Sequence, residues 1–318
     1  MRPKTSARPL RPRAVGLLVL LAGMGVHAAE SAAQDALLPT LTQRPASTRA
    51  MAMGDSYATT SGHADAIFYH PALLLGASGF GVELQRWGPN SSATAASAAM
   101  SWLGGSVGVG LRSMQYGAFG AGALAAPPGP DALFGLGSLS VSERVLTVGY
   151  ARTLPFGLDL GVAADFVDER IGSGRQNVTL FDVGVATVAG PVEVALTAQD
   201  LGDKPIQDSG AGPAKVVLGA GAYGRQVGIF DLGFAAHVGI DGNEEALFGG
   251  GVELGYWPIQ GRTFVVRAGF QNVPEGSDAA PFTTGFAFWG DDITVEWAWR
   301  PVSDAENGGT HRFGLRWR

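Results

Sequence analysis

Gly54-Asp55-Ser56 and the two histidines that follow it are the residues of this chain whose types and spacing could do chemistry. A serine in a Gly-Asp-Ser block is typical of one class of lipases, in which a histidine held by a carboxylate takes the serine proton. Those enzymes place the histidine in a late Asp-x-x-His block, and this chain contains no Asp-x-x-His. The block is therefore interpreted as a turn, in which Asp55 and Ser56 cap backbone N–H groups.

His63 and His70 bracket Asp65, which raises the possibility of a metal site. Metal-binding histidines usually come in closely spaced pairs, and the five histidines here are scattered without any His-x-His or His-x-x-x-His pair. The sequence therefore predicts polar contacts for these side chains, and neither a metal nor a cofactor.

All of these residues fall within one compact stretch, Arg49–Leu75, which is rich in small residues. Its apolar run, Ala64–Tyr69, is stopped by Pro71, and proline would remove a helical hydrogen bond, so a helix over this run should end there. The stretch predicts a mostly non-strand insert around which the rest of the chain closes.

From Gly79 onward the chain alternates with a period of two, which places successive side chains on opposite faces of a sheet. In Ile293–Pro301, for example, Trp297 points to the apolar face and Ala298 to the other. The fourteen predicted strands are Gly79–Gly88, Ala93–Leu103, Gly105–Ala118, Ser138–Leu154, Gly157–Ile171, Gln176–Ala189, Pro191–Leu201, Ala214–Arg225, Gly228–Ile240, Ala246–Pro258, Arg262–Asn272, Phe282–Gly290, Ile293–Val302 and Thr310–Arg318.

A soluble β-sandwich would alternate too, but two features favour a membrane barrel. Most segments are as long as the roughly 9–11 residues of a tilted membrane strand, whereas soluble strands average about 5–6. The connections after even-numbered strands are short, and those after the third, seventh, eleventh and thirteenth are longer, as expected for the two rims of an outer-membrane barrel. The predicted fold is an all-β, transmembrane antiparallel barrel of about 14 strands with a short N-terminal plug segment.

The insert also carries a recognisable pattern: R-A-x-x-M-G, a run of small residues, then D-A-x-x-x-x-P-A-L. This pattern resembles the N-terminal signature of the PorV/PorQ group of outer-membrane barrels, which are related to the FadL-type long-chain fatty-acid transporters. The family usually has asparagine where this chain has His70. The matching positions are Arg49, Ala50, Met53, Gly54, Asp65, Ala66, Pro71, Ala72 and Leu73.

Composition agrees with an exported barrel. Five basic residues precede an apolar core at Ala14–Gly25, which reads as a secretory signal peptide that is too short to span a bilayer. No later apolar run is long enough for a transmembrane helix. Without the five basic residues that precede the apolar core, 17 basic residues face 28 acidic ones, a net charge of −11, which argues against nucleic acid as a partner. Cysteine is absent, so the exported fold has no disulfide framework. Glycine is abundant, at 48 of 318 residues, and together with the low share of charged residues this composition is typical of a membrane β-barrel.

The lumen and one connection carry the remaining candidate features. Lumen-facing glycines, Gly161, Gly233, Gly239 and Gly314, leave backbone surface for the insert to approach. Phe119–Gly137 is a long apolar connection that would lie on the outer leaflet, gather a hydrophobic ligand, bind a partner, or fold into the barrel mouth. The proposed plug motif is Arg49, Met53, Gly54, Asp55, Asp65, Phe68, His70 and Pro71.

Charged residues of both signs fall on the predicted lumen face. A mixture of signs suggests ion pairs that hold the insert, more than a selectivity ring, which would have one sign. The lumen-facing charged residues are Glu83, Arg112, Asp165, Glu253, Arg267, Glu296 and Arg312.

The predicted organisation is a signal peptide at 1–33, a plug segment at 34–78 and an outer-membrane barrel at 79–318, with outer-membrane lipid around it. The resemblance to PorV implies a role in type IX protein secretion, with secretion components or exported cargo as partners, and the chain length slightly favours this role. The resemblance to FadL-type proteins implies passive uptake of hydrophobic small molecules. An enzyme is the least favoured class.

Overall fold

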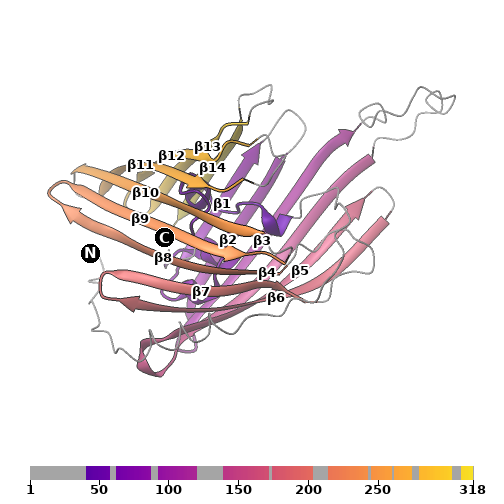
Figure 1. Cartoon of the computed structure of the whole chain (residues 1–318), viewed down its shortest axis with the longest axis horizontal. Helices are drawn as coiled ribbons and strands as arrows, with labels where there is room; N and C mark the ends of the chain where they lie inside the picture. The colour runs from indigo at the N-terminus through magenta and orange to yellow at the C-terminus, as the bar shows by residue number, and fades with distance from the viewer. Residues whose placement is uncertain are drawn as a thin grey trace.

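The computed structural model of the chain describes residues 41–57, 62–86, 92–119, 139–171, 174–202, 214–242, 245–259, 261–273, 279–302 and 309–317. Within them, fourteen antiparallel strands form a closed barrel, in which β1 and β14 pair with each other (Figure 1). The strands are β1 (Gly79–Arg86), β2 (Ser92–Trp102), β3 (Gly105–Phe119), β4 (Leu139–Thr153), β5 (Asp159–Ile171), β6 (Gly174–Ala189), β7 (Val192–Leu201), β8 (Lys215–Val227), β9 (Phe230–Ile240), β10 (Ala246–Ile259), β11 (Arg262–Gln271), β12 (Phe282–Trp289), β13 (Ile293–Arg300) and β14 (Thr310–Trp317).

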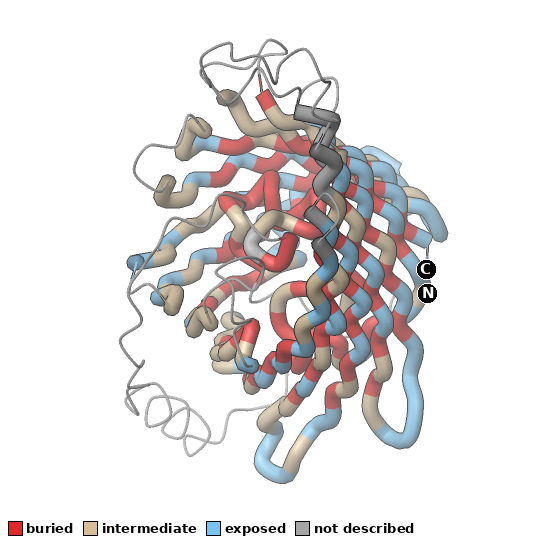
Figure 2. The backbone as a smooth tube through the Cα atoms, turned by 90° about the vertical axis from the view of Figure 1, so that its right-hand side faces the viewer, coloured by how far each residue is buried: buried red, intermediate tan, exposed pale blue. Residues whose placement is uncertain are grey.

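The barrel is apolar outside and polar inside, the reverse of a soluble protein. In β14, Phe313, Leu315 and Trp317 are about half exposed, while Arg312 and Arg316 are buried. Figure 2 shows the same alternation of buried and exposed residues along neighbouring strands. An apolar outer band around a polar interior is the arrangement that a bilayer requires, because lipid meets one face of each strand and the lumen meets the other. The predicted fold class is confirmed.

The predicted strand boundaries agree with the structure to within two residues at every end. Connections after even-numbered strands contain two to five residues, one of them forming the short 3₁₀ turn η5 (Pro155–Gly157). The longest intervals between strands, 120–138, 202–214, 272–281 and 301–309, follow the odd-numbered strands β3, β7, β11 and β13. The predicted apolar connection at 119–137 lies outside the described residues, apart from Phe119, which ends β3.

The described residues before β1, 41–57 and 62–78, are called the plug. They contain η1 (Leu41–Gln43), α2 (Thr48–Ala52), η2 (Ala64–Phe68) and η3 (Pro71–Leu74). The helix expected over Ala64–Tyr69, ending before Pro71, is present: η2 spans Ala64–Phe68 as a 3₁₀ helix, and Pro71 begins η3. Proline suits a first helical position because its missing N–H has no partner there. The short helix α2 was not predicted.

None of the helices among the described residues is both long and apolar enough to cross a membrane.

The outward face yields a first testable prediction. Val252 lies in the middle of β10 and is 60% exposed on the outer surface. Val252→Arg should lower the stability of the barrel in bilayers by about 2–4 kcal/mol, since a charge near the midplane faces lipid. Urea titration of the heat-modifiable folded form measures this loss. Val252→Leu is the matched control and should behave as the parent; equal stability of both variants would show that this face does not meet lipid.

Candidate functional site: the plugged lumen

The plug spans the interior of the barrel between opposite walls. The helix α2 lies against β11–β14, η2 lies against β1–β4, and η3 lies against β3–β6. Figure 2 shows these short helices, mostly buried, inside the ring of strands. The plug thus occupies the space that a closed barrel of this size encloses beyond its own side chains.

Glycines on the wall allow the plug backbone to approach it. A Cβ atom added at Gly161 would lie 2.2 Å from the backbone of Pro71 and Ala72, and one at Gly269 would lie 2.1 Å from the backbone nitrogen of Gly54. Both distances are impossible for real side chains, so any other residue would push the plug away.

The four lumen-facing glycines singled out in the sequence divide into two pairs. Gly161 and Gly314 meet the plug, Gly314 through the Thr48 hydroxyl. Gly233 and Gly239 instead meet Tyr223 and the backbone of β8, so their predicted role toward the insert was wrong. The reason is local: at these two positions the neighbouring strand fills the space above the glycine.

A chain of buried ion pairs begins and ends on the plug. Arg49 of α2 pairs with Glu253 of β10 at 3.0 Å, and Glu253 also pairs with Arg267 of β11 at 2.7 Å. Arg267 reaches Glu296 of β13 at 2.9 Å. These contacts form a continuous series of ion pairs from the plug through β10, β11 and β13 of the wall.

The series of ion pairs ends on the plug again, at η2. Glu296 pairs with Arg316 of β14, and Arg316 lies 3.6 Å from Asp65 of η2. His63, beside Asp65, contacts both Arg49 and Arg316 through its ring nitrogens, at 3.4 and 3.3 Å. The wall therefore joins two helices of the plug that are remote from each other in sequence.

A second anchor holds the start of α2. Glu83 of β1 accepts hydrogen bonds from the backbone and side chain of Thr48, and Arg312 of β14 pairs with Glu83 at 3.2 Å. Arg312 also donates to the carbonyl oxygens of Pro45 and Ala46. Together the two anchors contain four arginines and four carboxylates, so their formal charges cancel.

The balance matters because every one of these charged groups is buried. Removing a charge from water costs several kcal/mol, and close pairing offsets this cost only when each charge keeps its partner. The structure thus brings together five of the seven lumen-facing charged residues that the sequence proposed. The remaining two, Arg112 and Asp165, lie apart from this chain and 3.8 Å from each other.

The remaining residues of the proposed plug motif contact other parts of the wall. Met53 and Gly54 lie against β10 and β11, and Gly54 takes a positive φ of 65°. Phe68 lies beneath the Arg112 guanidinium, 5.1 Å from the ring centroid. The ring of His70 packs against Gly184 of β6, and burial lowers its pKa to about 4, so the imidazole is neutral.

Asp55 follows Gly54 in the same turn and also takes a positive φ of 58°. Burial raises the pKa of its carboxyl to about 6, against the attraction of nearby cations such as Lys215 and Arg300.

Two tyrosines of the plug were missed by sequence reasoning. Tyr57 and Tyr69 stack with ring centroids 4.6 Å apart. The Tyr57 hydroxyl donates to Asp65 at 2.6 Å, and the Tyr69 hydroxyl accepts from the backbone of Ala46 and Ser47. Twelve residues separate the two rings in the sequence, and no local spacing pattern would have paired them.

Tertiary structure also supplies a partner for Ser56. Its hydroxyl lies 2.8 Å from Nδ1 of His237 on β9. Among the described residues, no carboxylate forms a hydrogen bond with His237, so the pair lacks the third member that a hydrolase uses to orient its base. The contact fastens the plug to β9, and the capping role expected for Ser56 was wrong.

An apolar cluster lies on the lumen side of β2–β6, toward the rim with the longer connections. Its inward-facing side chains come from five consecutive strands, and Leu41 of η1 packs on them. Inward positions of open porins are polar, so an apolar patch at this place is a feature of function or of plug packing. The wall residues of the cluster are Ala93, Met114, Val145, Val167 and Leu180.

A closed barrel with an apolar outer face and its own N-terminal segment packed in the lumen is a plugged membrane barrel in architecture. No protein-family model matches the chain. No curated protein matches it in sequence.

Solved structures do resemble the fold. The toluene transporter TodX of Pseudomonas putida aligns with a TM-score of 0.52 and 11% identity, over 84% of this chain and 95% of that one. The monoaromatic hydrocarbon channel CymD gives 0.52 and 11%, over 85% and 95%. A FadL homologue from Pseudomonas aeruginosa gives 0.51 and 8%, over 85% and 97%.

These likenesses show that the chain has the fold of FadL-type channels. The sequence resemblance to the PorV/PorQ group within that wider class stays an expectation.

The ion chain yields a second prediction. The polypeptide contains no cysteine. Ala50→Cys, at a fully buried position of α2, therefore introduces a single thiol that reports plug opening. In this background Arg49→Met should increase the rate of thiol labelling about 100-fold, because removing one partner of a buried pair costs about 3 kcal/mol.

The control is Arg175→Met, which breaks an exposed pair with Asp168 and should leave the labelling rate within a few-fold of the parent. Equal labelling in both variants would mean that the buried ion pairs do not hold the plug.

The plug itself yields a third prediction. Deletion of Ser47–Leu75 should convert the barrel into a pore with large, steady conductance in planar bilayers, since it removes most of the material that fills the lumen. The intact chain should conduct poorly under the same conditions. If the intact barrel already conducts like an open porin, the segment does not block the lumen.

Proposed function

We propose that this protein is a passive outer-membrane channel for hydrophobic small molecules, exported by its predicted signal peptide. The observation that carries the proposal is the apolar cluster of β2–β6, which presents large apolar side chains inside a barrel whose lumen also carries many buried charged and polar groups. The fold similarity to channels that are named for toluene and monoaromatic hydrocarbons supports the same class of substrate.

The plug gives the proposed channel its selectivity. It excludes a continuous column of water, so ions and sugars have no path, whereas an apolar solute can bind where Leu41 now packs. The contacts that hold the plug differ between its two sides. On the side of β10–β14 it is held by ion pairs. On the side of β3–β6 it is held by apolar packing of Phe68 and Leu74 against glycines, together with hydrogen bonds of the Leu41 backbone to Glu143 and Arg112.

This difference suggests the route that a substrate takes. Apolar contacts are non-directional, and an apolar solute can replace them at little cost. Buried ion pairs lose several kcal/mol when they separate. The proposed route therefore follows the wall of β2–β6, while the ion pairs keep the plug attached to the opposite wall.

Assistance of type IX secretion, implied by the resemblance to PorV, is the second candidate. Its support is the sequence pattern around Arg49 and Asp65, residues that the structure places in plug anchoring. Because anchoring explains the pattern without cargo, the channel function is preferred.

The fourth prediction tests the channel. The double variant Val145→Thr/Val167→Thr keeps the shape of the cluster but adds two hydroxyl groups. Uptake of toluene by cells that lack other hydrocarbon channels should fall about tenfold, because an apolar ligand would bury hydroxyls that it cannot hydrogen-bond, at about 1–3 kcal/mol each. Uptake of a hydrophilic sugar should be low and equal in parent and variant.

The matched control is Val148→Thr/Val162→Thr, which makes the same change on the outward face of β4 and β5. It should leave uptake unchanged. Toluene uptake no faster with the parent protein than in cells without it would reject the channel and favour the secretion role.

A further inference from the structure

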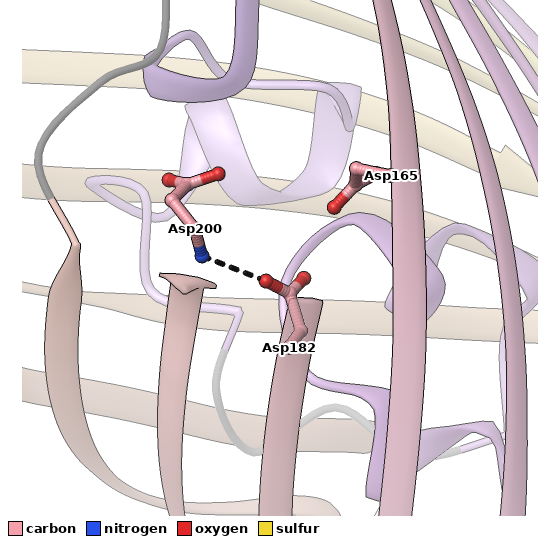
Figure 3. A group of neighbouring side chains, drawn as sticks. All are labelled: Asp165, Asp182 and Asp200. Carbon is pink, nitrogen blue, oxygen red and sulfur yellow. Dashed lines mark hydrogen bonds between the residues drawn. The ribbon is translucent and has the colours of Figure 1, made fainter. Parts of the chain in front are cut away.

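Three aspartates converge on the lumen side of β5, β6 and β7, away from the ion pairs that hold the plug. Asp165, Asp182 and Asp200 are each at least 94% buried, and one oxygen of each lies within 4.8 Å of the others. Figure 3 shows the three carboxylates facing a common space. Sequence reasoning placed Asp165 on the lumen face but did not connect it with Asp182 or Asp200, because these two come from separate strands and neither belongs to a motif.

The charges of this cluster are not balanced, in contrast to the ion chain. Arg112 lies 3.8 Å from Asp165, a distance too long for a hydrogen bond. Lys215, at the start of β8, attracts Asp182 and Asp200 electrostatically. Three buried carboxylates therefore face two cations that are not hydrogen-bonded to them, so their mutual repulsion is only partly offset.

The hydrogen bonds of the cluster leave an oxygen facing inward. Asp165 accepts from the Thr147 hydroxyl, and Asp182 accepts from the backbone N–H of Asp200 at 2.8 Å. One oxygen of Asp200, Oδ2, is fully buried and has no hydrogen-bond partner. A buried charged oxygen without a donor costs several kcal/mol, and a cation bound at this position would offset that cost.

We propose that Asp165, Asp182 and Asp200 bind a divalent cation, and that the cation is Ca²⁺. Carboxylate oxygens are the ligands of hard cations, and Ca²⁺ accepts them at about 2.3–2.6 Å in flexible arrangements. Two oxygens on opposite sides of such an ion are about 4.6–5.2 Å apart, so oxygens that all lie within 4.8 Å of one another can share one ion. Mg²⁺ requires shorter distances and near-ideal octahedral geometry, so it fits less well.

The site has a structural role that does not depend on the proposed channel function. The register of β6 with β7 shifts between Phe181 and Val183, so Asp182 and Asp200 lie where the regular ladder is interrupted. Asp200 also interacts with Thr42 of the plug. A cation at this place would join β5, β6, the end of β7 and the start of the plug.

Calorimetric titration of the purified, folded full-length barrel with CaCl₂ tests the proposal. We expect one site per chain, with a dissociation constant on the order of 10⁻⁴–10⁻³ M, as in extracellular calcium modules. Asp182→Asn and Asp200→Asn should each weaken binding at least tenfold, while MgCl₂ should bind more weakly than CaCl₂. The control Asp168→Asn alters a partly exposed carboxylate of β5 and should bind as the parent.

The possible outcomes separate clearly. Absence of heat in the parent up to about 10 mM CaCl₂, an order above the weak end of that range, would overturn the proposal. Calcium binding that is equal in the parent and both variants would also overturn it, since the ion would then sit on bound lipid or at another place. Should one variant fail to fold, the other still tests the cluster, since each removes one of the proposed ligands.

Discussion

The need to balance charge inside a closed barrel governs this structure. Arg49 on the plug cannot be buried without Glu253, and Glu253 cannot be buried beside it without the right register of β10 and β11. The same requirement passes through β13 and β14 and returns to the plug at Asp65. Because Glu253, Arg267, Glu296 and Arg316 each pair with two neighbours, the position of the plug and the pairing of the wall strands depend on each other.

Close packing completes what the charges begin. Glycines on β5 and β11 let the plug backbone lie against the wall, where any side chain would overlap it. On the opposite face of each strand, apolar side chains meet lipid and contribute no packing to the interior. The core of this protein is therefore the plug and the lumen lining, so the N-terminal segment is part of the fold.

The interior is not uniform, and the difference between its parts points to function. The wall of β10–β14 binds the plug through paired charges, whereas β2–β6 offers apolar side chains and glycines. Farther along, β5–β7 gathers three carboxylates with too little positive charge beside them. One arc thus holds the plug, a second suits a hydrophobic solute, and a third suits a cation.

The sequence by itself determined the strands, their faces and the place of the plug. A period of two and the lengths of the connections are local properties, and a bilayer makes the period strict, because each residue of a strand faces either lipid or lumen. Only the tertiary structure decided which groups meet across the lumen. Ser56 with His237, Tyr57 with Asp65, and Asp182 with Asp200 depend on barrel closure and on the register of distant strands. Local patterns cannot encode these contacts, since each partner has the same spacing and polarity as many residues that remain apart.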